Sequence, residues 1–358
     1  MNPYPSQPQQ HHHHGYGQPQ QAPMMQAPQA SAQNTPFKFT FVRGGNAATV
    51  FAKDGMMTPQ GLVLDGMHLP LACILDTETV QRRIVLKLGY PQAVHPSIQG
   101  FMEQDSLVIE VRSPAARMIE IAIDRFASYA EAEGYRQQLA AQGREREFWV
   151  VACPFCQSTV NLSTLPRSGY YYCRFCTSIH HHQQPLPQTT KYRTCDECSM
   201  FDRNQTYSEF YFYFLVVVYG FRYVQRQMCD TCAKGLFWKT FLINFIFVLG
   251  VPSAVWIRVK LAIGREPSLQ KLADANGLAL KGNAQGARAI FAELHQILPD
   301  HPGLHVNEAR GHAQAGDVAS ATASLRAALA ACPNYVPATD LMQKLHAALP
   351  PGQGAWQG

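Results

Sequence analysis

Four Cys-x-x-Cys pairs in the middle of the chain constrain its fold more than any other feature of the sequence. A Cys-x-x-Cys turn places two sulfur atoms on one side of a metal ion, and two such turns complete a tetrahedral zinc site. Residues 148–235 are therefore expected to fold around metal ions. The cysteines of these pairs are Cys153, Cys156, Cys173, Cys176, Cys195, Cys198, Cys229 and Cys232.

Other uses of such pairs fit this sequence less well. The N-terminus has no basic start followed by an apolar core, so we expect no secretory signal and a reducing cytoplasm, where thiols bind metals rather than forming disulfides. A thioredoxin-like redox site needs one pair at a helix start within a βαβ unit, and iron–sulfur clusters use tighter or asymmetric spacings. A catalytic zinc ion keeps an open position. We therefore expect two structural Zn²⁺ ions.

The first two pairs are separated by residues 157–172, which contain two short strand-like runs around a turn. This spacing resembles a zinc ribbon, in which a hairpin returns the second pair to the metal. The third and fourth pairs lie farther apart, and the aromatic residues 210–224 between them favour a long β-hairpin. A second ribbon is expected there, although pairing of the first Cys-x-x-Cys turn with the third at one metal ion stays open. His180–His182 are assigned to a linker.

The N-terminal part divides into a polar tail and a β-rich region. Residues 1–36 consist mainly of Pro, Gln, His, Met and Ala and are expected to be disordered. Residues 37–147 contain seven short strand-like runs, the last over 118–123, and then a helical pattern from Phe126. This layout resembles a pleckstrin-homology-like β-barrel with a C-terminal helix. The resemblance implies phosphoinositide binding through basic loops, but Arg82, Arg83 and Lys87 are interpreted as one solvated strand face.

An uncharged run over residues 240–257 has the length and composition of a membrane span. Trp238 and Trp256 lie at its two ends, where interfacial aromatic residues belong. We therefore expect one transmembrane helix within residues 236–263 and a single-pass membrane protein whose zinc module faces the cytoplasm. A buried core helix, or a re-entrant hairpin bent at residues 250–252, is the alternative.

Residues 268–301 and 302–335 align at a period of thirty-four residues. Small residues recur where two helices would cross, a glycine recurs at the turn between them, and a proline recurs after the second helix. This pattern resembles the tetratricopeptide repeat (TPR), although Lys271 and His305 replace the usual large first-helix residue. The matching pairs are Ala275 and Ala309, Gly282 and Gly316, Ala287 and Ala321, Phe291 and Leu325, and Pro299 and Pro333.

The TPR resemblance implies a groove on the first-helix face that binds a protein or peptide. Two repeats followed by a helix from Val336 fall short of the usual minimum of three, so self-association is expected. The candidate partner-binding residues in this groove are His305, Asn307, Glu308 and His312.

The fold class predicted for the whole chain is multidomain α+β, with a small β-barrel, two zinc ribbons, one transmembrane helix and TPR-like repeats. No nucleophile–base set, phosphate loop or carboxylate pair stands out, so a non-catalytic, membrane-anchored adaptor is expected. The alternative is a zinc-ribbon regulatory or nucleic-acid-binding protein, because basic residues alternate with aromatic ones; these are Lys191, Arg193, Arg203, Arg222 and Arg226. The predicted boundaries are 1–36, 37–147, 148–185, 186–235, 236–263, 264–350 and 351–358.

Overall fold

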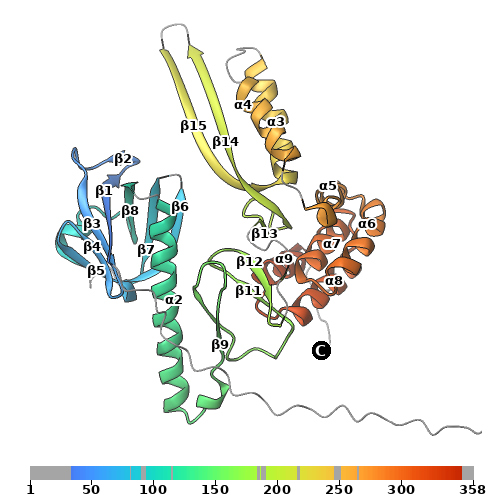
Figure 1. The fold of residues 1–358 in the computed structure, drawn as a ribbon, viewed down its shortest axis with the longest axis horizontal. Helices are drawn as coiled ribbons and strands as arrows, with labels where there is room; N and C mark the ends of the chain where they lie inside the picture. Colours follow the sequence, from blue (N-terminus) through green and yellow to red (C-terminus); the bar gives the residue numbers. More distant parts are fainter. Residues whose placement is uncertain are drawn as a thin grey trace, which may run out of the picture.

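The computed structural model describes residues 34–80, 82–89, 94–113, 116–183, 186, 191–215, 218–245, 251–263 and 266–348. The disorder predicted for 1–36 and 351–358 lies outside this part of the chain, except that the first strand already begins at Thr35. An antiparallel sheet lies at one end of the molecule, a bundle of helices lies at the other, and the cysteine-rich segments lie between them (Figure 1).

The N-terminal region is an antiparallel sheet in the order β5-β4-β3-β1-β8-β7-β6, with β2 added on β1. Among the described residues the path ends at β5 and β6, so the β-barrel predicted for residues 37–147 is corrected to an open sheet. Alternate side chains of β1 supply much of its core, and the ring of Phe41 stacks on that of Phe101 at 4.1 Å. The strands are β1 (Thr35–Arg43), β2 (Asn46–Ala47), β3 (Lys53–Thr58), β4 (Gly61–Leu64), β5 (Met67–Pro70), β6 (Ile74–Val80), β7 (Arg83–Leu88) and β8 (Ser106–Ser113).

A long helix, α2 (Ala116–Ala141), packs on the sheet and continues past it to the cysteine-rich region (Figure 1). The strand predicted over 118–123 is therefore wrong, because these residues form the start of α2. Ala116, Ile119 and Ile123 are buried at helical spacing, whereas a short apolar run also fits a strand pattern. Shorter helical turns are η1 (Leu71–Cys73), α1 (Pro96–Gln99), η3 (Glu145–Glu147) and η4 (Pro267–Leu269).

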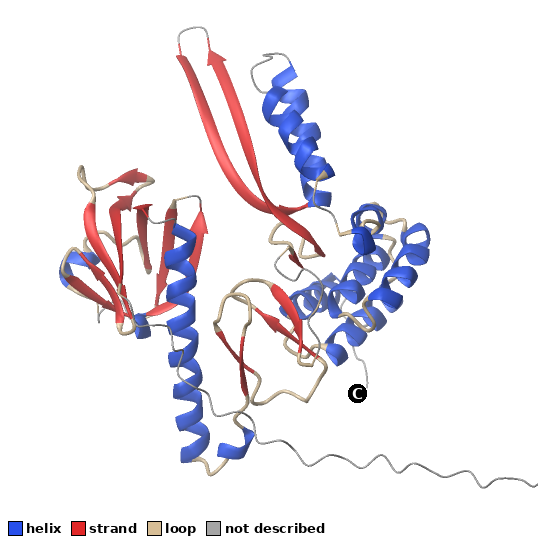
Figure 2. Ribbon diagram, in the orientation of Figure 1, coloured by secondary structure: helices blue, strands red, loops and turns tan. Residues whose placement is uncertain are grey.

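In the part of the cysteine-rich region that the structure describes, the strands form three antiparallel sheets (Figure 2). In the third, the long hairpin predicted from the aromatic residues is confirmed, because β14 and β15 pair continuously from Asn204 and Cys229 to Leu215 and Val218. The sheets are β9–β10, β11–β12 and β13–β14–β15, formed by β9 (Val150–Ala152), β10 (Thr159–Asn161), β11 (Tyr170–Cys173), β12 (Ser178–His181), β13 (Tyr192–Thr194), β14 (Phe201–Leu215) and β15 (Val218–Cys229).

The apolar run over 240–257 contributes to two helices rather than one. α3 (Asp230–Phe245) and α4 (Val251–Ala262) lie side by side, and the residues joining them, 246–250, lie outside the described part (Figure 1). Within the described residues, none of the helices has the length and apolar character that a membrane crossing requires. This finding corrects both the transmembrane helix predicted within 236–263 and the membrane localisation.

The physical reason for this correction lies in where the helices begin. α3 begins at Asp230, far ahead of the apolar run, and Pro252 occupies the first turn of α4, where its missing N–H costs nothing. Ile257 and Leu261 of α4 are buried in one cluster with Tyr207 of β14. Part of the apolar run therefore forms protein core.

The C-terminal helices confirm the predicted helical region and its internal period. Gly282 and Gly316 occupy the two equivalent turns with φ of +74° and +80°, a conformation that favours glycine. One turn feature also recurs that the sequence reading missed: Asn283 and Asp317 each accept a hydrogen bond from a backbone N–H three residues on. The helices are α5 (Leu272–Leu280), α6 (Ala284–Ile297), α7 (Pro302–Gln314), α8 (Val318–Ala331) and α9 (Val336–Ala348).

Two asparagines dock these helices onto the cysteine-rich sheets by binding main-chain groups. Asn307 accepts a hydrogen bond from the N–H of Phe201 (2.9 Å) and donates one to its carbonyl (2.7 Å). Asn334 does the same with the N–H (2.9 Å) and carbonyl (2.8 Å) of Tyr172. Each side-chain amide thus takes the place of a neighbouring strand, and one hydrophobic core runs across the contact.

Replacing Asn307 with alanine should destabilise this contact, because the buried N–H of Phe201 would lose its hydrogen-bond acceptor and the C=O would lose one of its two donors. We expect a loss of about 1–3 kcal/mol in the free energy of unfolding. Urea unfolding measures it, with Gln296→Ala on the exposed face of α6 as the control. Equal stability of the two variants would contradict the role given to Asn307.

Asp124 should make the stability of the N-terminal sheet depend on pH. Burial raises its pKa from 3.8 to about 7, while Thr77 donates a 2.6 Å hydrogen bond to its carboxylate. The pKa of Asp124 is higher in the folded than in the unfolded protein, so the folded state binds this proton more tightly. The stability that proton binding adds is complete below pH 3.8 and is lost as the pH rises through about 7.

We expect a loss of about 1 kcal/mol between pH 6 and pH 8. The side-chain amide introduced by Asp124→Asn would still accept the Thr77 hydrogen bond without titrating, so unfolding of that variant should lose this pH dependence. Urea unfolding at several pH values measures the effect, and parallel pH curves for the two proteins would contradict it.

Candidate metal centres

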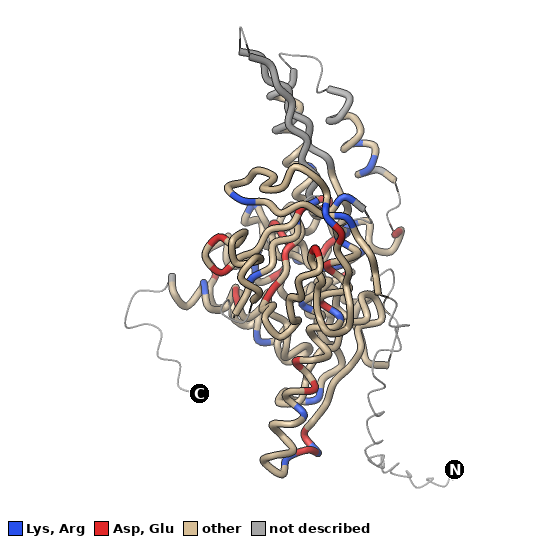
Figure 3. Tube along the Cα trace, turned by 90° about the vertical axis from the view of Figure 1, so that its left-hand side faces the viewer, with Lys and Arg blue, Asp and Glu red and all other residues tan. Residues whose placement is uncertain are grey.

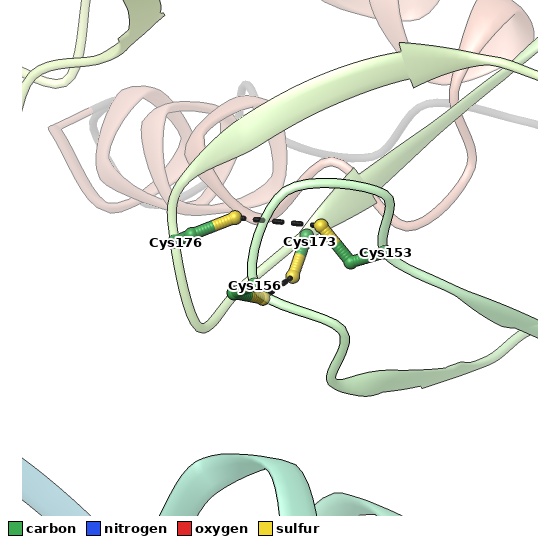
Figure 4. A group of neighbouring side chains, drawn as sticks. All are labelled: Cys153, Cys156, Cys173 and Cys176. Atoms are coloured by element: carbon green, nitrogen blue, oxygen red, sulfur yellow. Dashed lines mark hydrogen bonds between the residues drawn. The ribbon is translucent and has the colours of Figure 1, made fainter. Parts of the chain in front are cut away.

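The first cysteine cluster is built from two turns that approach each other from separate sheets (Figure 4). Cys153 and Cys156 lie on the loop between β9 and β10, and Cys173 and Cys176 lie at the β11–β12 turn. All four are buried, and their sulfur atoms lie within 4.8 Å of one another. The sequence prediction that the first two pairs meet is therefore confirmed.

The distances between the sulfur atoms identify the kind of site. Cys153 Sγ lies 3.6 Å from Cys176 Sγ, and Cys156 Sγ lies 3.5 Å from Cys173 Sγ. A disulfide needs about 2.05 Å, so these are separate thiols. A zinc ion with four Zn–S bonds of about 2.3 Å would hold its sulfurs about 3.8 Å apart along each edge of the tetrahedron. The cluster therefore fits one zinc ion with only slight adjustment.

The backbone of the first and third pairs repeats one tight turn. The N–H of the leading cysteine donates to the carbonyl five residues later, and the N–H four residues later donates back to the leading cysteine. The residue after each of these pairs has a positive φ, 63° for Gln157 and 54° for Ser199. This turn aims both sulfurs to the same side, which is the geometry that zinc ligation requires.

The second cluster combines such a turn with the start of a helix. Cys195 and Cys198 lie on the turn before β14, while Cys229 ends β15 and Cys232 lies in the first turn of α3. Cys198 Sγ is 3.7 Å from Cys229 Sγ, again close to a tetrahedral edge. The N–H of Cys229 donates to Cys195 Sγ at 3.3 Å, and the positive end of α3 favours thiolate. A cluster that joins the first Cys-x-x-Cys turn with the third is thus excluded.

Packing four thiols together changes their acidity in opposite directions. Hydrogen bonds from Cys156 and its neighbours lower the pKa of Cys153, whereas hydrogen bonding to Cys153 raises the pKa of Cys173. In the second cluster the pKa of Cys195 is lowered and that of Cys229 is raised for the same reason. Four adjacent thiolates repel one another, so full ionisation requires a cation among them.

His180 belongs to the first cluster rather than to a linker. It lies buried on β12, with its Nε2 3.3 Å from Cys153 Sγ and 2.7 Å from Ser178 Oγ. The linker assignment of His180 missed this role as a hydrogen-bond partner of the thiolate. The signal was present in the sequence, since Cys176, Ser178 and His180 alternate as residues on one face of a strand do.

A buried ion pair supports the second cluster. The guanidinium of Arg203 on β14 donates to both carboxylate oxygens of Asp230 at 2.9 and 3.0 Å, and both side chains are 2% exposed. Arg203 also donates to carbonyls at the end of α4, including that of Leu261, and Tyr207 donates to Asp230. Asp230 is the first residue of α3 and follows Cys229 directly, so the pair joins the hairpin, both helices and the metal cluster.

The candidate partner-binding residues fall into different environments. Asn307 is fully buried, and its side chain hydrogen-bonds to the main chain of Phe201 in the protein's own strand β14. His305 and Glu308 lie close together beside His295, which sequence reasoning did not select. His312 Nδ1 lies 3.6 Å from Asp317 Oδ2. No family model, curated protein or solved structure matches the chain.

Removing one thiolate of the first cluster should release one metal ion. We expect the cysteine clusters to hold two zinc ions per chain in the intact protein and one in Cys173→Ser, because three thiolates and a hydroxyl bind zinc far more weakly. Mass spectrometry under non-denaturing conditions counts the ions. Cys73→Ser, a buried cysteine outside both clusters, is the control and should keep both ions. Retention of both ions by Cys173→Ser would contradict the assignment.

Proposed function

We propose that this protein is a non-catalytic, zinc-structured scaffold whose TPR-like C-terminal repeats bind extended protein segments. Each four-cysteine cluster offers a zinc ion four thiolates, which leaves no position for a substrate or an activated water molecule. The zinc ions would therefore hold the two cysteine-rich modules in shape, as zinc ribbons do, rather than take part in a reaction.

The observation that carries the proposal is the way in which α5 and α7 hold Phe201. Asn307 binds both main-chain groups of Phe201, and Asn276 of α5 adds a second hydrogen bond to the same carbonyl at 3.0 Å. Main-chain hydrogen bonds give affinity in strand recognition, and a side-chain pocket gives specificity. The first-helix face of the repeats thus already binds an extended segment, which belongs to the same chain.

A pocket for the aromatic ring completes this recognition. The Phe201 ring lies 4.3 Å from the His301 ring, measured between centroids, and is buried. Gly303 at the start of α7 leaves room for the base of the Phe201 side chain, since a Cβ there would lie 2.5 Å from Phe201 Cβ. This packing supports a preference of the repeats for a large side chain at this position as well as for an extended backbone.

The nucleic-acid alternative receives less support. Arg203, one of its five basic residues, is buried in the ion pair with Asp230 and cannot reach a phosphate. The side chains of Arg222 and Arg226 lie outside the described residues. Basic and acidic positions are interspersed along the described trace (Figure 3), and the net charge is only +5, whereas nucleic-acid binders concentrate basic residues on one face.

A labelled peptide with the sequence of residues 199–206 tests the proposal by fluorescence anisotropy. In the intact protein the chain's own strand competes at a high effective concentration, so binding should be weak. Full-length Phe201→Gly weakens that competitor, and we expect it to bind the peptide at least about ten-fold more tightly than the intact protein does.

Two controls make the result specific. A peptide with glycine at the position of Phe201 should not bind, because it leaves the pocket beside His301 empty. Adding Asn307→Ala to Phe201→Gly should abolish binding of the original peptide. Zinc content and circular dichroism establish that each variant is folded. If folded Phe201→Gly binds neither peptide, or binds both equally, the repeats are not a peptide-binding surface.

A further inference from the structure

We propose that His295, His305 and Glu308 form a third metal site, which binds a divalent transition-metal ion such as Zn²⁺ between helices α6 and α7. Their ligand atoms lie within 4.8 Å of one another. His295 Nε2 is 3.4 Å from one carboxylate oxygen of Glu308, and His305 Nδ1 is 3.6 Å from the other. Two imidazoles thus face one carboxylate from two sides.

The distances match metal ligation better than hydrogen bonding. A direct N–H···O hydrogen bond between these groups would be about 2.7–3.2 Å long, shorter than either contact. A tetrahedral zinc ion with N and O ligands at about 2.0–2.1 Å separates them by about 3.4 Å. The separations of His295 Nε2 from one Glu308 oxygen and of His305 Nδ1 from the other, 3.4 and 3.6 Å, are close to that value, as the Sγ–Sγ separations of 3.5–3.7 Å in the cysteine clusters are close to the one expected for the longer Zn–S bond.

The arrangement follows from the helix pairing. His305 and Glu308 are three residues apart on α7, so they share a face, and α6 packs antiparallel beside it and supplies His295. The rings of the two histidines lie 4.6 Å apart between centroids with 36° between their planes. Each ligand therefore comes from a rigid helix rather than from a loop, which fixes the site before metal binds.

This site differs in kind from the cysteine clusters. It has three ligands of the His₂Glu type, and their side chains are 22%, 17% and 21% exposed. A fourth coordination position is thus open to water or to a ligand from another molecule. Imidazole and carboxylate ligands suit Zn²⁺, Cu²⁺ and Ni²⁺ and give weaker binding than four thiolates, so occupancy would respond to metal supply.

Calorimetric titration of the full-length protein with Zn²⁺ tests the proposal, starting from protein that holds the two ions of its cysteine clusters. The His11–His14 run is replaced by alanine in every sample, because such a tract binds metal on its own. We expect one additional ion per chain. His305→Ala and Glu308→Gln should each weaken its binding at least about ten-fold.

His312→Ala is the matched control, since His312 lies one turn beyond Glu308 on α7 and should not affect the third ion. Co²⁺ added to protein whose cysteine clusters already hold Zn²⁺ gives a second readout. Bound at the third site, it shows ligand-field bands without sulfur charge-transfer bands, and Glu308→Gln should remove these ligand-field bands. Glu308→Gln preserves the side-chain shape, so the test holds even if His305→Ala fails to fold. Absence of a third ion, or its retention in folded Glu308→Gln, would overturn the proposal.

Discussion

The requirement that four cysteine sulfurs meet at the distance of a tetrahedral edge organises the centre of this molecule. The two-stranded sheets β9–β10 and β11–β12, which carry the first cluster, would be marginal in water on their own. In the first cluster, β9–β10 and β11–β12 are brought together by their turns, which carry the ligands. In the second, a hairpin and a helix meet at the cysteines.

Local spacing explains what the sequence revealed. The Cys-x-x-Cys pairs predict two metal clusters because the ligand geometry is encoded within four residues, and the period of thirty-four residues predicts the helix pairs because small residues and turn glycines recur in register. His180 was missed because its alternation with Cys176 and Ser178 indicates a shared strand face but not that this face turns inward. The N-terminal strands were mostly visible in the pattern, but closure of the sheet depends on pairing between distant strands.

The apolar run over 240–257 shows where such reasoning fails. Hydropathy measures the transfer of a segment out of water and cannot tell whether lipid or protein receives it. Here Ile257 and Leu261 enter a core with Tyr207, and Arg203 binds the carbonyls at the end of α4. These contacts join residues about fifty positions apart. Arg203 is among the basic residues on which the nucleic-acid alternative rests, and its buried partner Asp230 could be found only in three dimensions.

The two amide contacts between the repeats and the sheets have a consequence for how this protein can vary. Asn307 and Asn334 bind main-chain N–H and C=O groups. Every residue carries both groups, except proline, which lacks the N–H. Side chains that point away from the repeats on β11 and β14 can therefore change while the backbone contacts persist. The docking of the two modules thus depends on strand geometry, two asparagines and the apolar side chains buried between them, and only the outward-facing side chains of these strands are left comparatively free to diverge.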